Sequence, residues 1–174
     1  MNAASLYDAE TGLPTRALIA DRLGMALRSA ARTKQEVAVV LVDLAAVESA
    51  DGSPAPAGDV PAVVKEVADR LAAAVRGVDS VGRYGPETFA LVIQGDVDDE
   101  AVRVLARRLL FELSPPVTVG LRPYFVLARI GATTARPGGD DAATMLRRAD
   151  AALAEATRPD GDLFVLHAPP RGAD

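Results

Sequence analysis

Two charged residues with complementary hydrogen-bonding groups lie three positions apart in the stretch 76–89, which reads RGVDSVGRYGPETF. An arginine can donate two parallel hydrogen bonds to O6 and N7 of a guanine base. A carboxylate can accept hydrogen bonds from the N1 and N2 hydrogens of the same base. Arg76 and Asp79 are therefore candidate ligands for a guanine nucleotide. The alternative is structural, with Arg76 as the cation at a helix C-terminus and Asp79 as a turn residue.

The elements that must position these residues follow from the spacing of apolar residues. A helix is predicted from near Pro14 to about Arg32, and further helices over residues 60–76, 99–113 and 142–157. Strands are predicted over residues 37–43, 80–84, 88–93, 124–132 and 163–167. Because a direct hairpin interrupts the alternation of helices and strands, the sheet must be mixed. We expect one α/β domain over residues 1–167 and a flexible tail over residues 168–174.

Composition excludes several classes of protein. The 174-residue chain is 49% hydrophobic and 25% charged, which is typical of folded domains, and it contains no cysteine for a disulfide or a thiolate metal site. A net charge of −5 does not favour nucleic-acid binding. No apolar run is long enough to span a membrane, and the N-terminus lacks a signal-peptide pattern. These features predict a cytoplasmic protein with neither nucleic acid nor membrane as a partner.

Four sequence blocks, in a fixed order, carry a resemblance to a known family, and two later blocks agree with it. The chain resembles the GGDEF family, the diguanylate cyclase domain that makes cyclic di-GMP from two GTP molecules. The resemblance covers roughly residues 5–167. It implies a nucleotidyl-cyclase-like fold, in which a central mixed sheet of about five strands is flanked by helices and a hairpin carries the signature. The blocks are Asp8-x-x-Thr-Gly-Leu-Pro-x-Arg16, the strand ending at Asp43, Gly58-Asp59, Arg76-x-x-Asp79-x-x-x-Arg-Tyr-Gly85, Ile130-Gly131 and Arg148-Ala-Asp-x-Ala-Leu153.

The family signature, Gly-Gly-Asp/Glu-Glu-Phe, reads Gly-Pro-Glu-Thr-Phe at residues 85–89. The resemblance places Asp43 and Glu87 at the positions of two metal-coordinating carboxylates. Several positions that the family uses for acids, lysines or a phosphate-facing glycine hold other residues. They are Ala45, Glu48, Pro86, Thr88 and Thr157.

Phosphoryl transfer depends on metal ions, charge neutralisation and positioning, so these changes predict negligible cyclase activity. No cofactor is then required, and Mg²⁺ is expected only where GTP occupies the vestigial site. The family's guanine-recognising pair maps onto Asp51 and Asp59. Asp51 cannot donate as the family's asparagine does, so GTP binding should be weak. Alternatively, Asp59 is simply a helix N-cap.

A second site for cyclic di-GMP is implied by the resemblance. Family members often carry an inhibitory Arg-x-x-Asp motif, the I-site, five residues before the signature, and Arg76 and Asp79 have this spacing. The motif also occurs at residues 147–150 and 171–174, but only the first copy has the right context. The family site recruits an arginine from the following helix, for which Arg108 is the best match, with Arg103 and Arg107 as neighbours.

Three functions remain open from the sequence. The first is a catalytically inactive receptor that binds cyclic di-GMP through Arg76, Asp79 and Arg108, and that acts on a homodimer or on a protein partner. The second is a weak or heterodimer-dependent cyclase, which the retained Asp43 and Glu87 favour. The third is a protein-interaction module that binds no nucleotide.

Overall fold

The computed structural model describes residues 5–169. Its elements alternate along the chain much as the sequence predicts, with one additional strand. The helices are α1 (Arg16–Thr33), α2 (Val60–Ala74), α3 (Asp99–Leu113) and α4 (Ala142–Ala156). The strands are β1 (Glu36–Ser49), β2 (Ser80–Arg83), β3 (Thr88–Gly95), β4 (Val117–Val119), β5 (Arg122–Ala135) and β6 (Phe164–Leu166).

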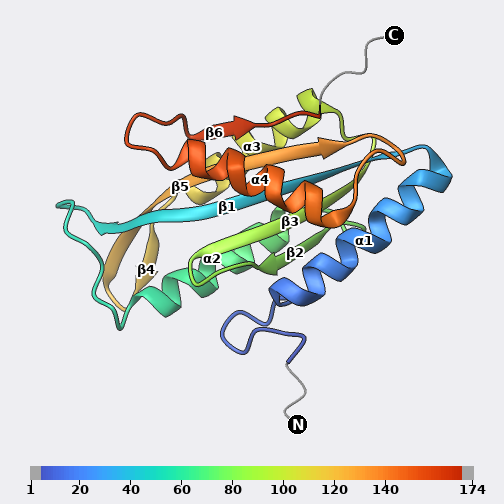
Figure 1. Cartoon of the computed structure of the whole chain (residues 1–174). Helices are drawn as coiled ribbons and strands as arrows, with labels where there is room; N and C mark the ends of the chain where they lie inside the picture. Colours follow the sequence, from blue (N-terminus) through green and yellow to red (C-terminus); the bar gives the residue numbers. More distant parts are fainter. Residues whose placement is uncertain (1–4, 170–174) are drawn as a thin grey trace.

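A six-stranded sheet forms the centre of the molecule (Figure 1), in the order β2-β3-β1-β5-β4, with β6 also paired to β5. Only the β5–β6 pair is parallel among these strands, so the prediction of a mixed sheet is confirmed. The expected count of about five strands is one short, because β4 was missed. This strand has three residues and forms a tight hairpin with β5 through Gly120, whose φ of +63 suits a glycine.

Each face of the sheet has its own apolar core, because side chains alternate along a strand. Val40, Val42 and Leu44 of β1 pack in one cluster with residues of α2 and α3. Val39 and Leu41 pack in the other cluster with residues of α1 and α4. The apolar stripe of α1 consists of Ile19, Leu23, Ala26 and Ala30, all buried. Figure 1 shows α1 and α4 on the near face of the sheet, with α2 and α3 behind it.

One glycine fixes how closely α4 approaches the sheet. A Cβ atom on Gly131 of β5 would lie 2.1 Å from the backbone nitrogen of Leu153 and 2.4 Å from its Cα atom. Only a residue without a side chain allows this contact. The close approach brings the C-terminal half of α4 directly onto β5.

Two helix starts agree with the sequence, and one does not. Asp98 accepts a hydrogen bond from the Ala101 amide, and Asp141 accepts one from the Thr144 amide, as expected for N-caps. Asp59 precedes α2 but its side chain makes no capping bond. The simple N-cap interpretation of Asp59 is therefore wrong, because its carboxylate is bound to Tyr124 instead.

The predicted end of α2 also needs correction, since the helix stops at Ala74, two residues before Arg76, and Val75 is extended. The predicted tail falls partly outside the structure, because residues 170–174 lie beyond the described part of the chain. Across residues 5–169, none of the helices has the length and apolar character to cross a membrane.

Candidate nucleotide-binding sites

Arg76, Asp79 and Arg108 line one pocket of about 230 Å³. Arg76 and Asp79 come from the connection between α2 and β2, and Arg108 comes from the middle of α3. The remaining walls are Asp96 and six apolar residues, which are Val75, Ile93, Val97, Ala101, Val104 and Leu105. The structure thus brings the three residues predicted for the second site into one apolar-walled pocket, which suits a planar base held at its polar edge.

Asp79 is the most buried of the three, with its side chain 3% exposed. Its Oδ2 atom accepts from the backbone N–H of Arg76 at 3.0 Å and from Nε of Arg76 at 3.3 Å. Its Oδ1 atom accepts from the backbone N–H of Gln94 at 3.1 Å. The carboxylate therefore ties the α2–β2 connection to the end of β3, as well as holding Arg76. Asp79 therefore stabilises the turn before β2, as predicted, and also binds the end of β3.

The side chain of Arg76 is 64% exposed, and its Nη2 atom donates to the Gln94 carbonyl at 2.6 Å. It does not complete the end of α2. That position is taken by Arg108, whose Nη2 atom donates to the Ala74 carbonyl in the last turn of α2. A guanidinium at a helix C-terminus also complements the helix dipole. The cation that completes the helix is thus Arg108, and Arg76 points to the pocket side of the hairpin.

At the opposite end of β3 lies the edge that the sequence assigns to catalysis. Thr88 lies directly across from Asp43 on β1, and its hydroxyl donates to Asp43 Oδ1 at 2.8 Å. On the other side of β1, the residue directly opposite Asp43 is Arg129 of β5. Arg129 is a feature that the sequence analysis missed. Asp43 therefore has the Thr88 hydroxyl on one neighbouring strand and Arg129 on the other.

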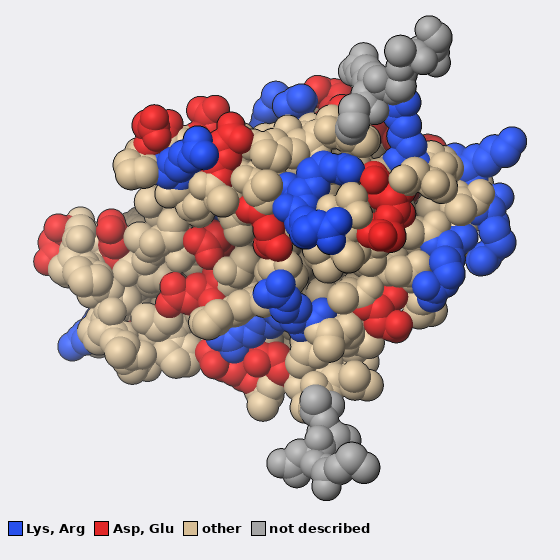
Figure 2. Space-filling model, in the orientation of Figure 1, with Lys and Arg blue, Asp and Glu red and all other residues tan. Residues whose placement is uncertain are grey.

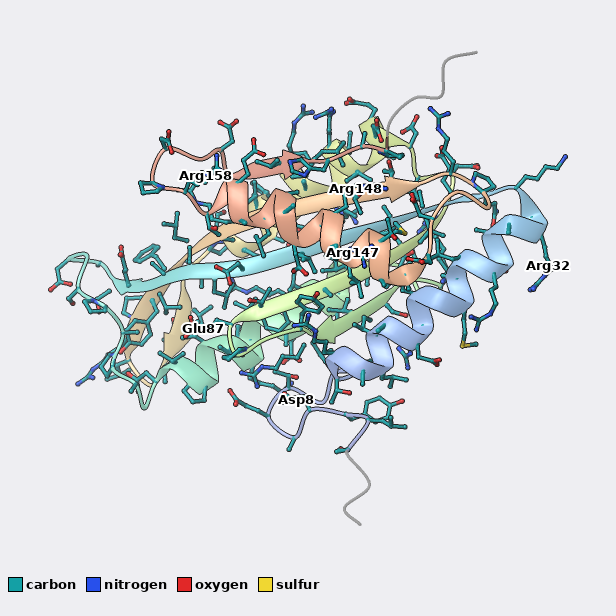
Figure 3. All side chains as sticks on the ribbon, in the orientation of Figure 1. Asp8, Arg32, Glu87, Arg147, Arg148 and Arg158 are labelled. Carbon is teal, nitrogen blue, oxygen red and sulfur yellow. The ribbon has the colours of Figure 1, made fainter. Side chains whose placement is uncertain are left out.

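These residues do not fit a resident metal ion. One oxygen of Asp43 is used by Thr88, and Glu87 is exposed at the hairpin tip (Figure 3). Divalent magnesium is normally held by several oxygen ligands. Within residues 5–169, no group of three or more His, Cys, Asp or Glu side chains is arranged to hold a metal ion.

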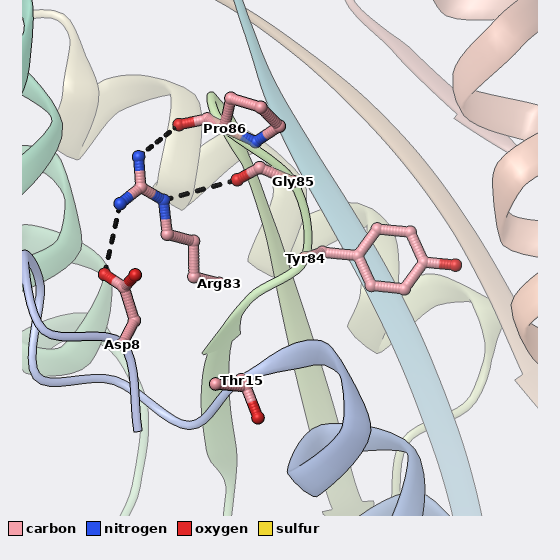
Figure 4. A pocket seen from close by; sticks show the side chains of 6 residues that line it. All are labelled: Asp8, Thr15, Arg83, Tyr84, Gly85 and Pro86. Carbon is pink, nitrogen blue, oxygen red and sulfur yellow. Dashed lines mark hydrogen bonds and ion pairs between the residues drawn. The ribbon is translucent and has the colours of Figure 1, made fainter. Parts of the chain in front are cut away.

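The turn of the hairpin is clamped by Arg83, in a pocket of about 280 Å³ (Figure 4). Its guanidinium donates to the carbonyls of Gly85 and Pro86 and to Asp8 Oδ2, the last at 3.1 Å. A further bond of 3.1 Å reaches Glu10. Burial on its own would raise the pKa of Asp8, but hydrogen bonds from Thr11 and Arg83 outweigh it and lower that pKa. The N-terminal loop and the signature turn are thus joined by one partly buried arginine.

The two residues predicted to recognise guanine in the vestigial GTP site are each engaged elsewhere. Asp51 is exposed, and hydrogen bonds from the Ser53 hydroxyl (2.6 Å) and amide (3.0 Å) lower its pKa. Asp59 accepts from the Tyr124 hydroxyl, and Arg122 Nη1 lies 3.9 Å from it. The bond to Asp59 is the main cause that raises the pKa of Tyr124. These contacts fall on one oxygen of each carboxylate, Oδ1 of Asp51 and Oδ2 of Asp59.

The chain resembles characterised proteins over most of its length. A family model described as "Diguanylate cyclase, GGDEF domain" matches residues 5–162. The chain is 33% identical over 152 residues to the bifunctional diguanylate cyclase/cyclic di-GMP phosphodiesterase MucR of Pseudomonas aeruginosa. That match covers 86% of this chain but 22% of MucR, so the chain spans about a fifth of that relative's length.

Solved structures agree with the sequence matches. Diguanylate cyclase SiaD of Pseudomonas aeruginosa, solved in complex with its activator SiaC, has a TM-score of 0.78 to this chain at 27% identity. The alignment covers 94% of this chain and 62% of SiaD. The GGDEF domain of DgcB from Caulobacter crescentus, solved in complex with c-di-GMP, shares the fold, with a TM-score of 0.76, 18% identity, and 95% and 98% of the two chains covered.

Proposed function

Because the chain belongs to the GGDEF family of diguanylate cyclase domains, we propose that it is a catalytically inactive member that acts as a cyclic di-GMP receptor. The ligand binds at the pocket formed by Arg76, Asp79 and Arg108. The observation that carries this proposal is the convergence of these three residues, from two separate segments of the chain, on one apolar-walled pocket.

The loss of catalysis rests on the edge around Asp43. Removing one preorganised donor that stabilises a transition state typically lowers the rate by 10²–10³, which is about 3–4 kcal/mol. In this chain the positions of two acids are held by Ala45 and Thr88, and Glu48 brings a negative charge toward the position expected for a phosphate. Since about 1.4 kcal/mol is a factor of ten in rate, several such losses together remove measurable turnover.

We call the pocket lined by Arg76, Asp79 and Arg108 the arginine pocket. Ligand binding there uses side chains that are already in place. Arg76 can turn its exposed guanidinium from the Gln94 carbonyl to O6 and N7 of a guanine. Asp79 can accept from N1 and N2 by giving up its longest contact, the 3.3 Å bond from Arg76 Nε, while keeping both backbone donors. Arg108, at the other side of the pocket, can meet a phosphate or the second base. The apolar walls cover the faces of the base.

Isothermal titration calorimetry with cyclic di-GMP tests the proposal. The wild-type chain should bind with a measurable heat, and Arg76→Ala should weaken binding by about tenfold or more, as expected for one charged hydrogen-bonding partner. Arg108→Ala should weaken it as well. Arg32→Ala, at the C-terminal end of α1 (Figure 3) and not among the residues that line the pocket, is the matched control and should bind as the wild type does. An absence of heat with the wild-type chain at high micromolar ligand refutes the proposal.

Retained Asp43 and Glu87 favour a second candidate, a weak cyclase that works alone or beside a complete partner. Incubation with GTP and either Mg²⁺ or Mn²⁺, followed by chromatography of the products, separates the two candidates. Formation of cyclic di-GMP by the purified chain, abolished by Glu87→Gln, would establish the enzyme. We expect none, because Asp43 is bound to Thr88 and lies directly across from Arg129.

A further inference from the structure

A part of the sheet is left uncovered next to the vestigial catalytic edge. On the face that α1 and α4 cover, β5 continues past α4 with Phe125 and Leu127, whose exposed fractions are 43% and 45%. Leu163, just before β6, is 47% exposed and has its carbonyl bonded to the amide of Ile130, which places it beside Arg129. We call Phe125, Leu127 and Leu163 the open sheet face. Figure 1 shows the ends of β1 and β5 extending beyond both covering helices.

The open sheet face has a rim of mostly negative charge. Glu48 of β1 lies directly across from Phe125 of β5. Arg129 follows Leu127 by two positions on β5, and Asp43 of β1 lies directly across from Arg129. Glu87 is exposed on the neighbouring hairpin tip. Asp160 and Asp162 are exposed in the loop before Leu163, against the basic residues Arg129 and Arg158. Figure 2 shows the same imbalance: acidic side chains outnumber basic ones in the left half of the view, where β1 ends and β5 begins.

A surface of complementary character lies on the opposite side of the sheet. Val104, Arg107, Arg108 and Phe111 of α3 are all exposed and follow one another at helical spacing, so they share one side of the helix. Val104 is 55% exposed and Phe111 is 74% exposed. Arg103 adds a third cation, while Glu100 and Glu112 lie near the two ends of the helix. We call Val104, Arg107, Arg108 and Phe111 the outer face of α3.

We infer that the open sheet face of one copy of this chain binds the outer face of α3 of a second copy. Apolar side chains meet at the centre of this contact, and the arginines of α3 meet the acidic rim. Two open sheet faces cannot pair with each other as well, because that would set two acidic rims together, and like charges across an interface are unfavourable. The occupant is thus a second copy that presents its basic helix.

Such a contact joins two different surfaces, so it is heterologous and need not close into a dimer. Each copy of such a pair keeps one free surface, and the pair as a whole keeps one of each kind, so further copies can add. The number of apolar side chains on each surface is small, so the contact is weak and transient. This inference does not depend on nucleotide binding, and its test contains no nucleotide, so it can fail while the proposed receptor function stands.

Sedimentation velocity of the purified chain tests the inference over concentrations that cover dissociation constants up to about 1 mM. The average sedimentation coefficient should rise with concentration and continue past the value for a dimer. Raising the salt from about 0.1 M to about 1 M shortens the Debye length from about 10 Å to about 3 Å and should weaken the association. Arg32→Glu changes an exposed charge outside both surfaces and should leave the association unchanged.

Charge reversals at each surface give the decisive comparison. Glu48→Arg on the rim and Arg107→Glu on α3 should each weaken self-association by about tenfold or more. An equimolar mixture of the two variants should recover the wild-type association, because each reversed surface then meets its reversed counterpart. Leu127→Ser, which removes an apolar contact, should weaken association in every mixture.

The inference is overturned if the wild-type chain remains monomeric throughout the concentration range. It is also overturned if assembly stops at a dimer that Arg107→Glu does not affect, which would indicate a symmetric contact elsewhere. A mixture that associates no better than either charge variant alone excludes the pairing of these two surfaces. Circular dichroism of each variant separates a lost contact from a lost fold.

Discussion

Asp79 allows the structural and ligand-binding roles of the arginine pocket to be separated. Replacing it with alanine removes three hydrogen-bond acceptor contacts from a side chain that is 3% exposed. Two of the abandoned donors are backbone amides: that of Gln94, in a partly buried bond, and that of Arg76, in a solvent-exposed one. Leaving a buried donor unpaired costs about 1–3 kcal/mol and leaving a solvent-exposed one costs less, so the loss of both bonds should cost about 2–4 kcal/mol.

Urea denaturation followed by circular dichroism measures the loss in the free energy of unfolding, and a thermal melt followed in the same way measures the change in melting temperature. For a chain of this size, each 1 kcal/mol lowers the melting temperature by about 2–4 °C, so Asp79→Ala should melt roughly 5–15 °C below the wild type. Arg76→Ala removes a side chain that is 64% exposed, and it should cost less than about 1 kcal/mol. Asp69→Ala breaks an exposed pair with Lys65 and is the matched control, with an expected cost below about 0.5 kcal/mol.

The two variants should therefore divide the two roles. Arg76→Ala should keep its stability and lose affinity for cyclic di-GMP, whereas Asp79→Ala should lose both. If Asp79→Ala unfolds within about 0.5 kcal/mol of the wild type, the three bonds contribute little and the reasoning is refuted. Asp79 would then be a ligand group with no structural task.

Two further predictions concern the packing of α4 on β5 and the hydrogen bonds of the N-terminal loop. Gly131→Ala should destabilise the fold by about 3 kcal/mol or more in the same denaturation assay, because the new Cβ atom would lie 2.1 Å from the backbone of Leu153. Gly58→Ala, whose Cβ atom would have nothing within 4 Å, is the control. Equal stability of the two variants would contradict the close approach of α4 to β5. Since the folded-state pKa of Asp8 is lowered, its bonds to Thr11 and Arg83 should stabilise the protein above its ordinary pKa of 3.8 and lose this effect as the pH falls through the lowered value. Asp8→Asn should flatten the acid limb of the stability profile, and an unchanged limb would show that other carboxylates govern it.

Long apolar patterns were sufficient to predict most elements, but not their ends. The β-branched run in residues 37–43 predicts a buried strand, yet β1 continues to Ser49. The additional residues have no alternating pattern, and they are held as a strand because β5 pairs with them through Tyr124. Val117–Val119 was missed because three residues give no period to detect. Its Val-Thr-Val alternation before Gly120 was the available signal.

Within the sites, the residue types were predictable and their neighbours were not. Arg108 could be predicted because the family resemblance implies an arginine from the helix after the hairpin, and the structure places Arg108 in the same pocket as Arg76 and Asp79. The Gln94 amide that binds Asp79, however, lies 15 positions away, and its place depends on the β2–β3 register. Arg129 lies across from Asp43 in a register that runs unbroken from the Val37–Ala135 pair to the Leu44–Ala128 pair and shifts only beyond Leu44. A single sequence does not reveal such a register.

β3 joins the two candidate sites and keeps the residues that anchor them apart. Thr88, which binds Asp43, opens the strand, and Gln94, which binds Asp79, lies near its end. Six residues at about 3.3 Å each separate them by roughly 20 Å. The strand interior between them, Phe89 to Ile93, is buried in the two cores and does not depend on the charges at either end. Substitutions at residues 86–88 therefore alter the catalytic edge without reaching the Asp79–Gln94 bond. The hairpin is one structural element that supports two separately anchored sites.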